Sequence, residues 1–80
     1  MDIEGKILDV MEEVFGIEKD ELRDNLDLDL FENELVDSLG LVTMLSELGS
    51  SVGKKFEIAK MAPESFRTVR SLTEAIEAQL

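Results

Sequence analysis

The sequence contains no cysteine and no histidine, and these two absences exclude whole classes of function. Without cysteine the chain cannot form a disulfide, and without either residue type it cannot build a zinc site like those that stabilise many small domains. A Ser-His triad and a cysteine nucleophile are excluded in the same way. Residue types alone leave a Ser-Lys or paired-carboxylate catalytic site open. However, nothing in the sequence places Lys54, Lys55 or Lys60 near Ser38, the serine at the start of the predicted central helix. We therefore expect a non-enzyme stabilised by helix packing.

Long apolar runs and basic residues are scarce as well. No apolar stretch approaches about eighteen residues and no basic, apolar leader is present, so we expect no membrane insertion, no secretion signal and a cytoplasmic protein. Eight Lys and Arg stand against nineteen Asp and Glu, which gives a net charge of −11. This charge disfavours nucleic acid and anionic membranes as partners and favours partners that are basic at the contact, although it also serves simply to keep a small domain soluble.

A chain of 80 residues allows one small domain, spanning 1–80, without a second core. The first helix is expected over 3–15, where apolar residues recur at helical spacing and Gly16 then ends the pattern. The predicted buried stripe of this helix contains Ile3, Ile7, Met11 and Val14, widened by Leu8 and Phe15.

The segment 16–37 is long for a connection, so we expect it to be partly structured. Residues 18–21 are expected to open a short helical turn, and the apolar residues of the segment are expected to point inward: Leu22, Leu26, Leu28, Leu30, Phe31 and Leu35. Residues 26–30 also alternate between apolar and acidic side chains, which is the period of a β-strand. The only candidate for a partner strand is 55–58, and this pair leaves an α+β fold as an alternative. A calcium loop beginning at Asp27 is excluded because Phe31, Glu32 and Ser38 occupy positions that such a loop needs for other residues.

The central helix is expected over 38–52, with Asp37 as its N-cap and Gly53 as its stop signal. Its predicted buried stripe contains Leu39, Val42, Leu45, Leu48 and Val52. Gly40 is expected to leave the space around Ser38 uncrowded.

The remaining chain predicts two more helices. After Phe56 and Ile58 return to the core, Pro63 is expected to open a short helix. The last helix is expected to follow Thr68 as N-cap and to bury Val69, Leu72, Ala75 and Ile76, with Leu80 as a further candidate for this stripe. A capping box over 71–74 is the alternative start. The chain is therefore expected to be all-α, a four-helix bundle of three longer helices and one short, with a long loop between the first and second helices.

Ser38 lies at the start of the central helix, where unpaired backbone N–H groups and the helix dipole favour a phosphate. Serine at such a position often makes only a local hydrogen bond. A nucleophile elbow is excluded because Val36 stands where its first glycine is needed and no strand precedes it. Phosphoryl attachment is therefore the chemistry that these residues favour.

The motif Asp37-Ser38-Leu39, preceded by Leu35-Val36, resembles the prosthetic-group site of acyl and peptidyl carrier proteins. The resemblance runs from about Ile3 to Ala78 and includes the start of the last helix at 66–72. It implies that Ser38 carries 4'-phosphopantetheine, which a phosphopantetheinyl transferase attaches from coenzyme A. It further implies that the terminal thiol of this arm holds an acyl or aminoacyl thioester.

The resemblance also implies where partner enzymes dock, namely on the start and exposed face of the central helix and on the loop before it. The matching positions are Glu34, Asp37, Leu39, Leu41 and Thr43, with Met44 and Met61 as candidate contacts for the arm or its cargo. The implied partners are the transferase, an acyl- or aminoacyl-activating ligase and a downstream transferase. We expect a monomer.

The central helix has few acids for a fatty-acid acyl carrier protein, because Gly40 follows the motif and Glu47 is its main acid. Residues 28–32 and 35–40 resemble D-alanyl carrier proteins, which present activated D-alanine for esterification of teichoic acids, although the chain has no tryptophan and lacks their Trp-Thr-Pro start of the last helix. Two alternatives stay open: a stand-alone acyl carrier protein of fatty-acid, polyketide or nonribosomal peptide synthesis, and an unmodified acidic helical interaction module.

Overall fold

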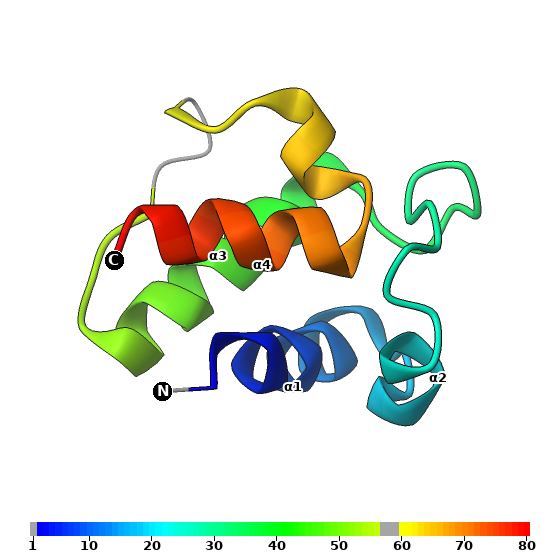
Figure 1. Ribbon diagram of the computed structural model, residues 1–80. Helices are drawn as coiled ribbons and strands as arrows, with labels where there is room; N and C mark the ends of the chain where they lie inside the picture. The colour runs from blue at the N-terminus through cyan, green and yellow to red at the C-terminus, as the bar shows by residue number, and fades with distance from the viewer. Residues whose placement is uncertain (1, 57–59) are drawn as a thin grey trace.

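The computed structural model describes residues 2–56 and 60–80. Its elements are α1 (Ile3–Phe15), α2 (Lys19–Arg23), α3 (Ser38–Val52), the 3-10 helix η2 (Pro63–Phe66) and α4 (Val69–Ala78) (Figure 1). Three of these helices are long, and no strand occurs within the described ranges, so the predicted all-α carrier-protein bundle is confirmed. Residues 26–30 form turns and irregular backbone instead of the alternative strand. Glu57 and Ile58, which belong to its candidate partner and include one predicted core residue, lie outside the described residues.

The helix boundaries follow from local hydrogen bonds at their ends. The Asp37 carboxylate accepts a hydrogen bond of 2.7 Å from the Gly40 N–H, and α3 ends where Gly53 turns left-handed at φ 71°. Thr68 is the N-cap of α4. Its hydroxyl accepts a hydrogen bond from the Ser71 N–H at 3.0 Å, while the Ser71 side chain accepts one from the Thr68 N–H. The alternative start at a box over 71–74 is therefore wrong. Leu80 is not part of the buried stripe, because it lies beyond the end of α4 and is 57% exposed.

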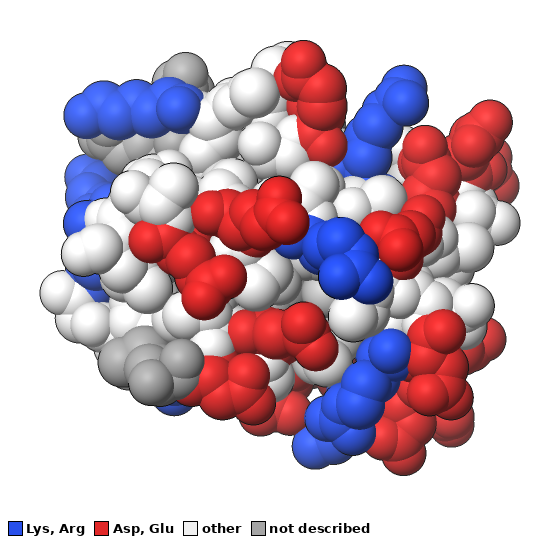
Figure 2. Space-filling view, in the orientation of Figure 1, with Lys and Arg blue, Asp and Glu red and all other residues white. Residues whose placement is uncertain are grey.

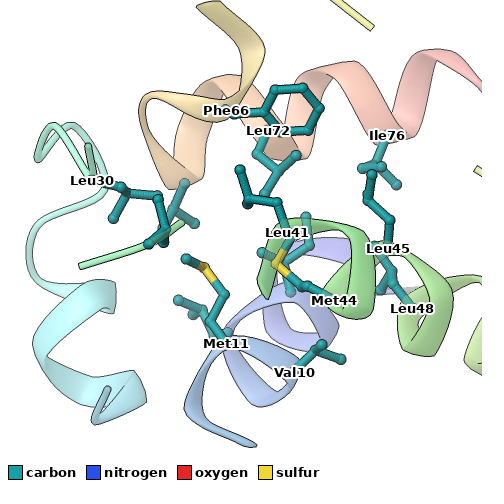
Figure 3. Close-up of a cluster of buried hydrophobic side chains, with 14 of the residues drawn as sticks. Val10, Met11, Leu30, Leu41, Met44, Leu45, Leu48, Phe66, Leu72 and Ile76 are labelled. Atoms are coloured by element: carbon teal, nitrogen blue, oxygen red, sulfur yellow. The ribbon is translucent and has the colours of Figure 1, made fainter. Parts of the chain in front are cut away.

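The core lies between the three long helices. Helix α1 packs against both α3 and α4, while α2 rests on α1 and η2 rests on α4 (Figure 1). Side chains from all of these elements meet in one apolar cluster, part of which Figure 3 shows. Its fully buried members include Ile7, Leu8, Met11, Leu22, Leu30, Leu41, Met44, Leu45, Leu48, Val69, Leu72 and Ile76.

The buried stripe of α3 differs from the predicted one. Leu41, Met44, Leu45 and Leu48 face the core, whereas Leu39 is 83% exposed. Val42 is 52% exposed, and only Leu45, Leu48 and the half-buried Val52 of the predicted stripe pack inward. The prediction failed because α3 carries apolar residues around most of its circumference, so helical spacing alone admits two stripes.

The long loop between α2 and α3 is held against the start of α4. The Leu30 N–H donates to the Arg67 carbonyl at 2.7 Å, and the Arg70 N–H donates to the Leu26 carbonyl at 3.1 Å. The guanidinium of Arg70 also pairs with Asp27 at 2.8 Å, and this hydrogen bond and charge attraction raise the pKa of Arg70. The loop is therefore an ordered wall of the bundle.

The apolar residues of this loop do not all point inward. Leu22 and Leu30 are buried and Leu26, Leu28 and Leu35 are partly buried, but Phe31 is 41% exposed. A tight turn lies here, closed by the Leu35 N–H donating to the Leu30 carbonyl at 2.9 Å. Because Leu30 fills the core at this turn, the side chain that follows it is directed outward.

Candidate functional site

Ser38 is the first residue of α3, and its side chain is exposed. Among the described residues, none makes a hydrogen bond to its hydroxyl. The neighbouring cap is fully used, because the Asp37 carboxylate accepts from Gly40 and the Asp37 carbonyl accepts from the Leu41 N–H at 3.0 Å. The structure thus leaves the hydroxyl of Ser38 accessible while the backbone beside it is held in place.

The loop reaches Ser38 through a turn with an unusual backbone conformation. Glu34 has a φ of 55°, which makes it the one non-glycine residue with a positive φ in the described chain. The turn is stabilised around Asp29, whose carboxylate accepts from the Glu32 N–H at 2.9 Å and whose carbonyl accepts from the Asn33 side chain at 2.7 Å. Phe31 and Glu34 both belong to this turn and are exposed, and both lie within seven residues of Ser38 in the chain.

A hollow of about 820 Å³ opens beside Ser38, and we call it the Ser38 pocket. Its size falls within the range of about 300–1,000 Å³ that is common for small-molecule sites. Its walls come from the loop, from α3 and from η2 with its flanks: Phe31, Ser38, Leu41, Met61, Pro63, Glu64, Phe66 and Arg67. Most of these side chains are apolar, with one carboxylate and one guanidinium among them.

The structure separates the predicted docking residues into two groups. Glu34, Asp37, Leu39 and Thr43 are exposed at or near the start of α3. Leu41 and Met44 are buried, with 2% and 0% of their surface exposed.

Leu41 and Met44 point into the apolar cluster (Figure 3). The prediction of Leu41 on the exposed docking face is therefore wrong, because Leu41 belongs to the stripe of α3 that packs on the core. Met44, which was predicted as a contact for the arm or its cargo, is fully buried in the same stripe and does not line the Ser38 pocket. Leu41 nevertheless reaches the Ser38 pocket with one edge, as does Met61 from the segment before η2.

Ser38 is exposed, as expected, but the space beside Gly40 itself is filled. A Cβ at this position would meet the ring of Phe15 from the end of α1. The glycine is needed because α1 and α3 approach each other closely here.

Sequence reasoning missed the contributions of Phe31, Glu64 and Arg67 to this site. Glu64 and Arg67 are far from Ser38 in the chain, and they meet Phe31 at this site because the loop is bonded to the start of α4. Arg67 lies within the stretch that resembles carrier domains, but the pattern gave no role to its side chain.

The charges around α3 differ from those of the rest of the surface. Acidic side chains spread over the face formed by α1, α4 and the loop, with a few cations between them (Figure 2). Helix α3 carries one acid, Glu47, and its exposed residues are otherwise neutral.

In the ranges 2–56 and 60–80 there is no group of three or more acidic side chains arranged to hold a metal ion. No helix in these ranges is long and apolar enough to cross a membrane.

Comparison with known proteins identifies the family. Residues 5–76 match the family described as "Phosphopantetheine attachment site". The chain belongs to this family. It is therefore a carrier protein, whose family bears covalently attached 4'-phosphopantetheine, and it is not itself an enzyme.

Curated relatives cover almost the whole of this carrier protein. It is 31% identical over 78 residues to the D-alanyl carrier protein of Enterococcus faecalis, which covers 98% of this chain and 97% of the relative. It is 32% identical over 75 residues to the D-alanyl carrier protein of Lacticaseibacillus casei, covering 94% and 90%. The D-alanyl carrier protein of Streptococcus sanguinis is 25% identical over 76 residues, covering 95% and 92%.

The residues around Ser38 fit a phosphate-linked arm of this kind. An accessible hydroxyl at a helix start offers a point of attachment close to unpaired N–H groups and the positive end of the dipole. The apolar walls of the Ser38 pocket suit the dimethyl part of a pantetheine chain, and the donors of Arg67 suit its phosphate or amide oxygens. The chemistry of the site is therefore consistent with the prosthetic group of the family.

Proposed function

We propose that Ser38 is the attachment site of 4'-phosphopantetheine in this carrier protein. A phosphopantetheinyl transferase would form the bond between the Ser38 Oγ and the phosphorus while the pyrophosphate bond of coenzyme A breaks. The hydroxyl proton then passes to a base, and 3',5'-ADP leaves. The observation that carries this proposal is the exposed Ser38 hydroxyl, which no described residue engages, at the capped start of α3.

The chain itself supplies the anchor and the surface around it. The Asp37 carboxylate holds the first turn of α3 through the Gly40 N–H, so that Ser38 keeps one position relative to the bundle. The attached group supplies a terminal thiol that carries an acyl or aminoacyl group as a thioester. Met61, at the edge of the Ser38 pocket, is the residue that we propose as a contact for the arm.

The cargo that we propose is D-alanine, used for D-alanylation of teichoic acid. The curated relatives support this assignment, since each of those named above is a D-alanyl carrier protein. The nearly neutral face of α3 supports it as well, because fatty-acid carriers usually carry more acids on the corresponding helix. The partners would be the phosphopantetheinyl transferase, a ligase that activates D-alanine and a downstream transferase, and the carrier would act as a cytoplasmic monomer of one domain.

The proposed docking surface consists of Glu34, Asp37, Leu39 and Thr43, which are all exposed. Leu39 is its most prominent apolar member. Partner enzymes that approach this surface would meet the Ser38 Oγ directly, since Ser38 lies between Asp37 and Leu39 in the first turn.

Intact-mass measurement tests the attachment site. The protein is incubated with coenzyme A, magnesium and a broad-specificity phosphopantetheinyl transferase, beside Ser38→Ala and the matched control Ser46→Ala, which changes another exposed serine of α3. We expect a gain of one phosphopantetheine in the wild type and in the control, and none in Ser38→Ala. No gain in the folded wild type, with an active transferase, would contradict the proposal and favour an unmodified interaction module.

Loading experiments then test the cargo. The holo-protein is offered to a D-alanine-activating ligase with D-alanine, and in parallel to an acyl-carrier synthetase with fatty acids. We expect a D-alanyl thioester that hydroxylamine releases. Fatty-acyl loading without D-alanyl loading would instead indicate a stand-alone acyl carrier protein.

A further inference from the structure

Arg67 is the only cation among the described residues that line the Ser38 pocket. Its guanidinium lies 3.9 Å from the Asp29 carboxylate, which is too long for a hydrogen bond, and its side chain is 68% exposed. Most of its donors are therefore available to another acceptor. The main-chain carbonyl of Arg67 accepts from the Leu30 N–H, so the backbone of this residue is held at the pocket wall.

An anion attached to Ser38 would need such a partner. The protein already has a net charge of −11, and Asp37 and Glu34 lie close to Ser38 in the chain. Glu64 contributes a further carboxylate to the pocket itself. A phosphodiester on Ser38 adds a negative charge to this region, and a guanidinium offers two parallel donors to phosphate oxygens.

We infer that Arg67 binds the phosphate that joins the prosthetic arm to Ser38 and so holds the first part of the arm in the Ser38 pocket. The apolar side chains of Phe31, Met61 and Phe66 then cover the dimethyl group that follows the phosphate. This inference rests on the proposed attachment at Ser38. It gives Arg67 a positioning role toward the arm that neither the family match nor the relatives assign.

Arg70 provides a matched control within the same chain. It also pairs with an aspartate of the loop, but its partner is Asp27 and it lines a different hollow, away from Ser38. Arg67→Gln and Arg70→Gln therefore remove the same charge from the same part of the fold, and only the first removes it from the Ser38 pocket.

The first experiment compares the arginine side-chain Nε–Hε signals of the wild-type apo- and holo-proteins by NMR, after mass spectrometry has shown complete conversion. We expect the Arg67 signal to move on conversion and the Arg70 signal to stay in place. An unmoved Arg67 signal overturns the inference. Failure of the conversion itself would instead contradict the proposed attachment at Ser38, so the two failures are distinguishable.

The second experiment measures the melting temperature of each variant in its apo and holo forms at low salt. We expect Arg67→Gln to lower the holo-minus-apo difference by about 2–4 °C relative to wild type, because one exposed charge pair is lost. Arg70→Gln should leave this difference unchanged, and Glu64→Gln should raise it because a repelling carboxylate is removed. The effect of Arg67→Gln should shrink in high salt. Equal effects of the two arginine variants, or none from either, would overturn the inference.

Discussion

The ring of Phe15, at the end of α1, occupies the space in which a side chain at Gly40 of α3 would begin. Phe15 is the last residue of its helix and Gly40 is the third residue of its own. This contact sets how closely the end of α1 approaches the helix start that carries Ser38.

The first prediction concerns this contact. Gly40→Ala is expected to lower the free energy of unfolding by about 1 kcal/mol, because overlap with the Phe15 ring outweighs the better helix propensity of alanine. Phe15→Leu removes the two ring atoms concerned. In the Phe15→Leu background, Gly40→Ala should therefore be neutral or stabilising, and urea unfolding of all four proteins measures this coupling. Equal effects of Gly40→Ala in the two backgrounds would show that the ring moves away without cost.

The second prediction contrasts two leucines that are two positions apart on α3. Leu39→Glu should leave the free energy of unfolding within about 0.5 kcal/mol of wild type, because Leu39 is 83% exposed. Leu41→Ala should cost about 2–5 kcal/mol, because it empties a core position. Leu39→Glu should also slow modification or loading by about five- to tenfold, as expected for the loss of an apolar interface contact. Unchanged rates in Leu39→Glu would remove Leu39 from the docking surface.

The third prediction uses the left-handed backbone of Glu34. Glu34→Gly should raise the free energy of unfolding by about 0.5 kcal/mol, because glycine adopts a φ of 55° without steric penalty and this gain exceeds the loss of unfolded-state constraint. The control is Glu32→Gly in the same turn, which has no such strain to relieve and should lower stability by about 0.5–1 kcal/mol. Thermal and urea unfolding compare the two. If Glu34→Gly is as destabilising as its control, the Glu34 backbone is not strained in solution.

The fourth prediction concerns the hydroxyl of Ser71. This hydroxyl accepts from the Thr68 N–H and lies 3.0 Å from the Ser65 carbonyl in η2, to which it can donate. Ser71→Ala should therefore lower the free energy of unfolding by about 1–2 kcal/mol through loss of the capping box and of the link to η2.

Hydrogen exchange provides the structural readout for Ser71→Ala. Amides of η2 should exchange faster in this variant, because Ser71 no longer ties the wall of the Ser38 pocket to α4. The matched control is Ser50→Ala, at an exposed position of α3, which should change stability by less than about 0.5 kcal/mol. An effect of Ser71→Ala no larger than that of the control would refute the role of this hydroxyl.

Helix boundaries were predictable from the sequence because their signals are local. Asp37 and Gly53 delimit α3 through caps that involve only nearby backbone groups, and Thr68 does the same at the start of α4. The family was recognisable from the motif around Ser38 together with a resemblance that runs from about Ile3 to Ala78. These features depend little on how the helices are arranged.

The inward face of α3 and the walls of the site were not predictable in this way. Leu39 and Leu41 are chemically identical, and only the way α3 packs against the rest of the bundle decides which of them is buried. The packing of the Phe15 ring beside Gly40 was not predictable, because the two residues lie far apart in the chain. Arg67 lies beside Ser38 because its main chain is hydrogen-bonded to the loop. No local sequence pattern predicts this long-range contact.

The bonding of the loop to the start of α4 has a consequence for the protein during its synthesis. The hydrogen bonds of Leu30 with Arg67 and of Leu26 with Arg70 join distant parts of the chain, so they cannot form until residue 70 has left the ribosome. Until then, a nascent chain presents Ser38 without the loop and η2 in place around it. A modifying enzyme that reads these walls would therefore distinguish chains in which the loop is bonded to α4 from chains in which it is not, and attachment of the arm would follow formation of this wall.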